Sequence, residues 1–258
     1  TYIVGGAVYQ HFAATGGATL AVLGHVGAWQ LTFIAVGAPG FLITGLLALL
    51  REPRRGSQVV QAPAAIPEVS IADVSRQLKR HARAYLALIG SMSMLAILGY
   101  GTMAWYPEFL MRTYGMDRAT AGGQFGVIFL VAGSLGTLAG GWSVQPLARR
   151  GRSDAPLLVI LACSMLWLVP AVLGPLAANA TLAVLAACPI IFFLNAYFGV
   201  GITGVQLITP PSMRAQVSAL MLFSTNLFGL AFGPSAVAIL TDFAFGNDLA
   251  LRYSLALL

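Results

Sequence analysis

The sequence is poor in charge. Only 9% of its 258 residues are Asp, Glu, Lys or Arg, against about 25% in typical soluble domains. None of these four types occurs in the first 50 positions. Hydrophobic residues make up 58% of the chain, and the mean hydropathy is +0.84. Because a water-soluble domain of this length could not bury so much apolar surface, we expect an integral, multi-pass membrane protein.

The chain also lacks the short motifs of common enzyme classes. It contains no HExxH zinc motif, no GxSxG nucleophile elbow, no CxxC pair and no Walker-type phosphate loop. It has neither an arginine ladder nor a potassium-filter motif. Its two cysteines, Cys163 and Cys188, lie within apolar runs and are expected to be small core residues. We therefore expect no catalytic residues, no cofactor and no metal site.

Positive charge is concentrated between the apolar runs. Of the 14 Lys and Arg residues, seven lie in 51–83. Short basic clusters of this kind are typical of the positive-inside rule and not of a nucleic-acid-binding face. With 51–83 placed in the cytoplasm, alternation of the spans brings four more arginines to that side: Arg149, Arg150, Arg152 and Arg214. Only three of the basic residues then lie at the outer side.

Apolar runs of about 20 residues predict membrane-spanning helices. Seven such runs are present, at 2–24, 29–50, 84–106, 120–143, 156–177, 181–208 and 216–241, and an eighth begins near Leu249. The fold class is therefore all-α, a polytopic transmembrane helix bundle. Within 51–83, the spacing of Ile71, Val74 and Leu78 predicts a short amphipathic helix on the membrane surface, after a mobile linker at 58–67.

Small residues and prolines inside the spans favour a closely packed bundle with bent helices. Glycines four apart let helix backbones approach, and prolines within a span introduce kinks. The glycine pairs are Gly136 with Gly140 and Gly229 with Gly233, and the mid-membrane prolines are Pro170, Pro189 and Pro234.

Polar groups inside the membrane are costly and therefore indicate function. His11 is an intramembrane ionisable residue that either relays protons or makes an interhelical hydrogen bond. Glu108, near the outer end of the third span, either pairs with Arg112 four residues later or acts as a coupling carboxylate. Asn195 and Tyr197 follow the proline of the sixth span and either line a cavity or bond neighbouring helices.

Several ordered motifs resemble those of one transporter family. The second span carries W-x3-F-x3-G-x-P-G followed by REP, and the third ends in WYPEFLMRTYGMDRATAG. GGWSVQPLARRGRSD follows the fourth span, and VQLITPPSMRAQVSAL contains Gln206 and Arg214. The last set is Asn226, Gly229, Gly233 and Pro234, with Asp242 and NDLALRYSLAL beyond. These motifs are similar to those of the major facilitator superfamily, in its Spinster-like branch.

The resemblance implies a transporter of two six-helix halves that works by alternating access. Residues 1–50 would then be the last two helices of the first half, 51–83 the central cytoplasmic loop, and 84–258 the second half with a truncated last helix. On this interpretation the chain is a fragment that lacks the first four helices. One departure is Gln145 with Pro146, where superfamily members usually carry an acidic and a basic residue.

The resemblance also implies where function resides. Helices seven and ten of such folds line the cavity, which points to Tyr100, Met103, Asn195 and Tyr197, with Trp105 in the same span as the first two. Substrates would be lipid-like amphiphiles such as lysophospholipids or sphingoid phosphates, with proton coupling through His11, Glu108 or the missing helices. The partners would be the lipid bilayer, a small amphipathic substrate and protons, without nucleic acid, for a monomer in a bacterial inner membrane. The alternatives are an exporter of drugs or small organic anions, and a non-transporting membrane enzyme or receptor.

Overall fold

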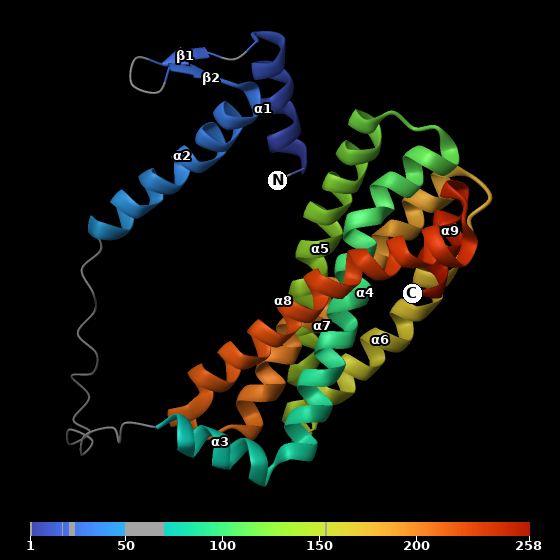
Figure 1. Cartoon of the computed structure of the whole chain (residues 1–258). Helices are drawn as coiled ribbons and strands as arrows, with labels where there is room; N and C mark the ends of the chain where they lie inside the picture. The colour runs from blue at the N-terminus through green and yellow to red at the C-terminus, as the bar shows by residue number, and fades with distance from the viewer. Residues whose placement is uncertain (1, 17, 21–23, 50–69, 153) are drawn as a thin grey trace. The chain divides into compact units, whose positions relative to one another are not determined.

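The computed structural model describes residues 2–16, 18–20, 24–49, 70–152 and 154–258 (Figure 1). The chain forms two compact units, Thr1–Pro67 and Glu68–Leu258, and each is described by itself. The expected linker at 58–67 lies outside the described residues.

The first unit contains two helices and a short hairpin. Helix α1 spans Tyr2–Ala14, strands β1 (Ala18–Leu20) and β2 (Gly24–Val26) pair antiparallel, and α2 spans Ala28–Leu49. The predicted helical span 2–24 is therefore wrong beyond Ala14. The helix ends because Gly16 adopts a left-handed φ of 71°, which glycine tolerates without a steric cost. Within the ranges that the structure describes, these six residues are the only ones in strands.

The second unit begins with the predicted amphipathic helix. Helix α3 spans Ile71–Arg80 and starts with a capping box, in which Ser70 Oγ accepts from the Asp73 amide at 3.2 Å. Hydrogen bonds from Ser70 hold the pKa of the Asp73 carboxyl below its ordinary value. Val74 and Leu78 pack against the core, whereas Ile71 is 90% exposed. The spacing of apolar residues thus predicts the helix and its buried face, except at its first residue.

Five long helices and a short one follow. They are α4 (Ala82–Tyr114), α5 (Arg118–Arg149), α6 (Ala155–Leu173), α7 (Ala180–Ile208), α8 (Arg214–Ile239) and α9 (Leu251–Leu257). A 3-10 turn, Pro211–Met213, precedes α8; a π-helical turn, Leu240–Phe245, and a 3-10 turn, Asp248–Ala250, follow it. In the described part of the chain, six helical segments are long and apolar enough to span a membrane, and they correspond to six of the seven predicted spans.

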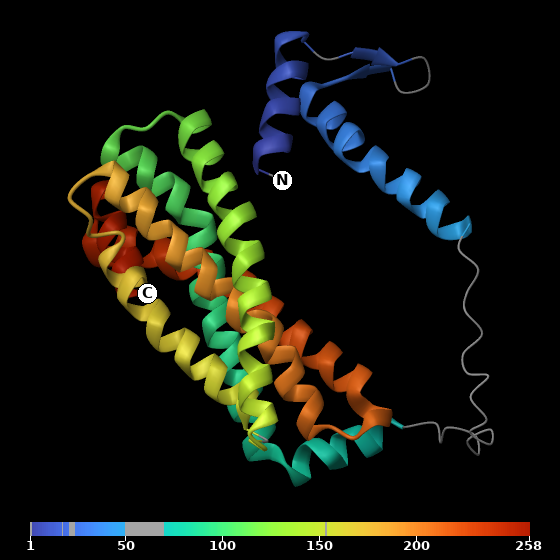
Figure 2. The same cartoon turned by 180° about the vertical axis from the view of Figure 1, so that it is seen from behind.

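The helices of the second unit alternate in direction, so its basic turns gather at one end. Figure 1 and Figure 2 show α3, the turn after α5 and the turn between α7 and α8 at the same end of this bundle. These turns carry Arg149, Arg150, Arg152 and Arg214. The positive-inside rule requires this arrangement if that end faces the cytoplasm.

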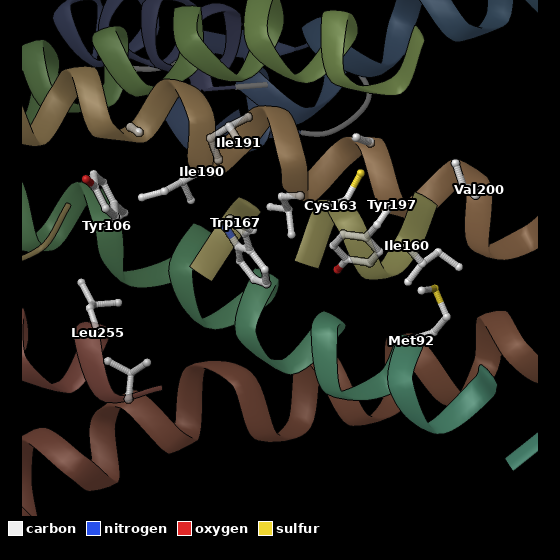
Figure 3. Packing of buried hydrophobic residues seen from close by; sticks show 14 of the residues in the cluster. Met92, Tyr106, Ile160, Cys163, Trp167, Ile190, Ile191, Tyr197, Val200 and Leu255 are labelled. Carbon is white, nitrogen blue, oxygen red and sulfur yellow. The ribbon is translucent and has the colours of Figure 1, made fainter. Parts of the chain in front are cut away.

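Glycines bring the helices of the bundle into close contact. A Cβ at Gly136 or Gly140 of α5 would collide with the backbone carbonyl oxygens of Phe192 and Ala196 on α7. Side chains from α4, α6 and α7 fill the interior, and Figure 3 shows Met92, Trp167 and Tyr197 within this cluster. Because lipid gives helices no hydrophobic drive to associate, close backbone packing supplies the contacts that hold the bundle together.

Candidate functional site

A cavity of about 240 Å³ lies among α4, α5 and α7. Nine residues line it: Ala96, Gly99, Tyr100, Met103, Phe129, Leu194, Asn195, Tyr197 and Phe198. Four of the five residues predicted to face a cavity, Tyr100, Met103, Asn195 and Tyr197, are therefore brought together in the structure. The positions that sequence reasoning missed are mostly one helical turn from these four, so helical spacing would have found Ala96 and Phe198.

Asn195 is oriented by its own helix. Its Nδ2 donates to the backbone oxygen of Ile191, four residues earlier, at 2.8 Å. Because a carbonyl oxygen can only accept a hydrogen bond, this contact identifies the atom of the Asn195 amide that faces Ile191 as the nitrogen. A Cβ at Gly133 of α5 would lie 3.2 Å from the same Nδ2, so the glycine provides the space in which the amide sits.

Tyr197 is almost completely buried, with 2% of its surface exposed. Its ring lies 6.3 Å from that of Trp167, and Figure 3 shows the hydroxyl oxygen on the side of the ring that faces α4. That oxygen would be 3.6 Å from a Cβ at Gly99. No described residue makes a hydrogen bond to the hydroxyl, which therefore stands unpaired beside the cavity.

Tyr100 connects the cavity to α8. Its hydroxyl donates to Asn226 Oδ1 at 2.6 Å, and Asn226 Nδ2 donates to the Leu222 carbonyl at 2.8 Å. Gly229 lies under the ring of Tyr100, since a Cβ there would be 2.8 Å from Cε2. Asn226, one of the motif residues of the sequence, is thus the partner that fixes the Tyr100 hydroxyl.

Trp105 is not among the residues that line the cavity. Its Nε1 donates to the Pro234 carbonyl at 2.9 Å, which ties α4 to α8 further along. The Arg112 guanidinium lies 5.8 Å from the centre of the Trp105 ring. Trp105 therefore contributes to the packing of α4 on α8.

Glu108 is not among the residues that line the cavity. Glu108 accepts from Arg112 Nε at 2.7 Å, the pairing expected at this spacing, and Arg112 also reaches Asp248 at 3.4 Å. Sequence reasoning did not identify Asp248. His11 lies on an exposed side of α1 in the first unit, with its ring 5.5 Å from that of Phe12.

The basic residues at the end of the bundle that carries α3 make different contacts from one another. Arg152 makes two hydrogen bonds to Asp154, at 3.0 and 2.8 Å, which lower the pKa of the Asp154 carboxyl. Arg149 and Arg150 are exposed and form no ion pair with any described residue. Arg214 Nε donates to the carbonyls of Gln206 at 3.0 Å and Thr209 at 3.2 Å.

These contacts close the turn between α7 and α8. The last carbonyls of a helix have no partners within it, and Arg214 supplies donors to that end of α7. The Gln206 side chain lies 3.5 Å from Ser218 Oγ on α8, and Tyr85 of α4 donates to the Ile208 carbonyl at 3.2 Å. The candidate motif residues Gln206 and Arg214 therefore join the ends of two helices.

Comparison with known proteins identifies the family. Residues 4–234 match the family model of the Major Facilitator Superfamily. The chain belongs to this superfamily. It is 28% identical over 215 residues to an MFS-type efflux pump of Mycolicibacterium smegmatis, which covers 83% of this chain and 48% of that protein. The chain thus spans about half the length of this curated relative.

Solved structures share the fold of this superfamily member. Two are crystal structures of a bacterial homolog of the human lysosomal transporter Spinster, in inward-facing unoccupied and occupied conformations. Each aligns with a TM-score of 0.65 over 99% of this chain, and the alignments cover 61% and 60% of the respective chains. The TM-score shows a shared fold, at sequence identities of 21% and 22%. The expected multi-pass, partial major facilitator bundle is confirmed.

Proposed function

We propose that this chain is part of a secondary active transporter of lipid-like amphiphiles that works by alternating access. The main support for this proposal is the cavity lined by Tyr100 and Met103 of α4 and by Asn195 and Tyr197 of α7. An apolar lining with a few polar groups is typical of small-molecule sites. Within the superfamily fold, these two helices correspond to helices seven and ten, which the resemblance assigns to the substrate cavity.

The substrate class in this proposal is lysophospholipids or sphingoid phosphates. Support comes from the lining, in which six of the nine residues have side chains without polar N or O atoms or no side chain at all, and from the fold shared with a Spinster homolog. The second candidate is export of drugs or small organic anions, which the similarity to an MFS-type efflux pump favours. We place the protein in a bacterial inner membrane as a monomer.

Proton coupling belongs to the same proposal. His11 and Glu108 are the candidates on this chain. Glu108 is paired with Arg112, so it would take up a proton only in a conformation that separates the two side chains. The domain division proposed is 1–50 for the end of the first half, 51–83 for the central loop and 84–258 for the second half.

The test is uptake by the complete protein in proteoliposomes. The panel should contain lysophospholipids, sphingoid phosphates, cationic drugs and organic anions, each with and without an imposed pH gradient. We expect gradient-dependent flux of the monoacyl lipids and its loss in Asn195→Ala and Tyr100→Ala. Ser164→Ala is a matched control, because Ser164 Oγ also donates to a carbonyl four residues earlier at 2.8 Å, but on α6 and outside the cavity lining. Absence of flux for every monoacyl lipid would refute the substrate class.

A further inference from the structure

Two open hollows adjoin each other at the end of the bundle that carries α3. The first is basic, lies at the corner between α3 and α4, and is lined by residues 79–84. The second is a groove between α4 and α8, and nine of its 13 lining residues carry no side-chain N or O atom. Lys79 and Ala82 line both hollows. A charged site is therefore continuous with an apolar groove.

The basic corner holds positive charge that no described carboxylate neutralises. Lys79, Arg80 and Arg83 are exposed and make no ion pair with any residue of the described ranges. The two described carboxylates at this end of the bundle, Asp73 and Asp154, each pair with an arginine outside the corner, at 3.0 and 2.8 Å. The corner is thus able to accept an anion from outside the described chain.

Helix α3 places these charges at the surface of a membrane. Figure 1 and Figure 2 show α3 running between the starts of α8 and α4. Val74 and Leu78 pack against the core, and the last turn of the helix is basic. An amphipathic helix of this kind lies at the boundary between lipid headgroups and acyl chains. The basic corner is therefore at the level of the lipid phosphates.

The groove leads from this level into the membrane. It follows α4 from Ala82 to Ile97, which is about 22 Å at 1.5 Å per residue. Half of a hydrocarbon core of about 30 Å is shorter than this. Leu86 and Met94 of the lining are 73% and 65% exposed. Apart from Lys79, the polar side chains of the lining are hydroxyls. The length and the apolar lining suit an acyl chain.

We propose that this pair of hollows binds one anionic diacyl phospholipid of the adjoining leaflet. Its phosphate contacts Lys79 and Arg83, and one acyl chain follows the groove between α4 and α8. A soluble anion would use the charges but leave the apolar groove empty. A zwitterionic lipid would bring a cation of its own to a corner that already holds three unpaired ones. Juxtamembrane Lys and Arg residues attract anionic lipids for this electrostatic reason.

The bound lipid is a fixed partner and not the transported molecule. Its site lies at the α3 end of the bundle, and of the residues that line it none also lines the cavity among α4, α5 and α7. The inference therefore does not rest on the proposed function, and the transport assay and the lipid-contact assay can succeed or fail separately.

The experiment measures contact between a lipid and the groove. The complete protein carries Leu86→Cys labelled with bimane, with every other cysteine replaced by alanine, in bilayers of phosphatidylcholine. Phosphatidylglycerol or phosphatidylcholine with brominated acyl chains is added, and quenching of the fluorophore is followed. Phosphatidylglycerol should reach half-maximal quenching at about one tenth of the mole fraction that phosphatidylcholine needs. A bimane at Leu161 of α6, which is 55% exposed and also near this end, should show no preference.

Single substitutions assign the preference to the corner. Lys79→Gln and Arg83→Gln should each reduce it to about threefold or less, because each removes one cation near the phosphate. Arg150→Gln is the matched control, because Arg150 is also exposed and unpaired in the described ranges and lies at the same end of the bundle. It should leave the preference unchanged. Raising the salt from about 0.1 M to about 1 M shortens the Debye length from about 10 to about 3 Å and should also weaken the preference.

Several results would overturn the inference. Equal quenching by the two lipids would mean that the charges select no headgroup. The same preference at Leu161, or the same loss in Arg150→Gln, would mean that anionic lipid only accumulates along the whole basic face. A preference that survives both Lys79→Gln and Arg83→Gln would place the headgroup elsewhere. Absence of quenching by either lipid would mean that another segment of protein fills the groove.

Discussion

Replacement of Gly233 by alanine tests whether close packing of α4 on α8 stabilises the bundle. A Cβ at this position would lie 2.6 Å from the Ile97 carbonyl oxygen, 2.8 Å from the Gly101 nitrogen and 3.1 Å from Tyr100 Cβ. The first two atoms belong to backbone, so no side-chain rotation relieves the clash. Carbon and oxygen in close contact are usually 3.3–3.6 Å apart, and the two helices must therefore separate by roughly 0.7 Å.

The magnitude follows from two opposing terms. Overpacking of a well-packed interior costs about 1–3 kcal/mol. Replacement of a helical glycine by alanine returns about 0.5–1 kcal/mol through the reduced backbone entropy of the unfolded chain. The net loss is about 1.5 kcal/mol, which corresponds to a fall in Tm of about 3–6 °C for a domain of this size. Separation of the helices also stretches the 2.6 Å hydrogen bond from Tyr100 to Asn226. This effect lowers the stability of the bundle as well.

The control is Gly141→Ala on α5, where a new Cβ would meet nothing within 4 Å. Only the entropy term applies there, and the Tm should rise by about 2 °C. Both variants of the complete protein are measured by thermal unfolding in detergent, followed by size-exclusion chromatography. The reasoning fails if Gly233→Ala raises Tm as Gly141→Ala is expected to do, because the contacts at Gly233 would then carry no steric cost.

Three further substitutions test individual contacts. Tyr85→Phe leaves the ring but removes the hydrogen bond to Thr209 Oγ1 at 3.0 Å. It should lower the free energy of unfolding, measured by denaturation in detergent, by about 1–2 kcal/mol. An unchanged free energy of unfolding would mean that the contact is not formed. Arg214→Ala should cost about 1 kcal/mol by exposing the end of α7, and Arg214→Lys should restore part of it. Ser70→Ala removes the cap of α3 and should speed amide exchange there about fivefold. Acid should also speed amide exchange in α3 of the wild type. The pKa of Asp73 in the folded state lies below its value in the unfolded state. The contribution of Asp73 to helix stability is therefore complete above the unfolded pKa and is lost as the pH falls through the folded pKa. Exchange that is insensitive to both changes would contradict the cap.

The membrane helices were predictable because length and composition suffice for them. A segment of about 20 apolar residues has few alternatives in a bilayer, where backbone groups must bond within the segment. The strand pair at 18–20 and 24–26 was not predictable on this ground, because 2–24 is uncharged and apolar throughout apart from a few polar positions. Its determinants are local: Gly16 turns the chain with a φ of 71°, and short strands then pair Thr19 with His25. An average of hydropathy over a window of residues does not reveal the conformation of a single glycine.

The cavity was partly predictable because polar residues in apolar spans are few. Tyr100 and Met103 are three apart on α4, so they share a face. Trp105 is five residues from Tyr100, about 140° around the helix at 100° per residue, and it is absent from the cavity lining. The bond from Tyr100 to Asn226 required knowledge of which helices pair, since 126 positions separate the two residues. Sequence spacing predicts faces of a helix, and tertiary packing decides what each face meets.

The polar residues of the cavity share one structural feature. Each lies against a glycine of a neighbouring helix: Asn195 against Gly133, Tyr197 against Gly99, and Tyr100 against Gly229. A Cβ at these glycines would stand 3.2 Å from the Asn195 nitrogen, 3.6 Å from the Tyr197 oxygen and 2.8 Å from Tyr100 Cε2. The space that lets the helices approach is thus the same space that the polar side chains use. Helix packing and the placement of hydrogen-bonding atoms are therefore one constraint, since a shift of α5 or α8 against its neighbours would displace the groups that a ligand meets.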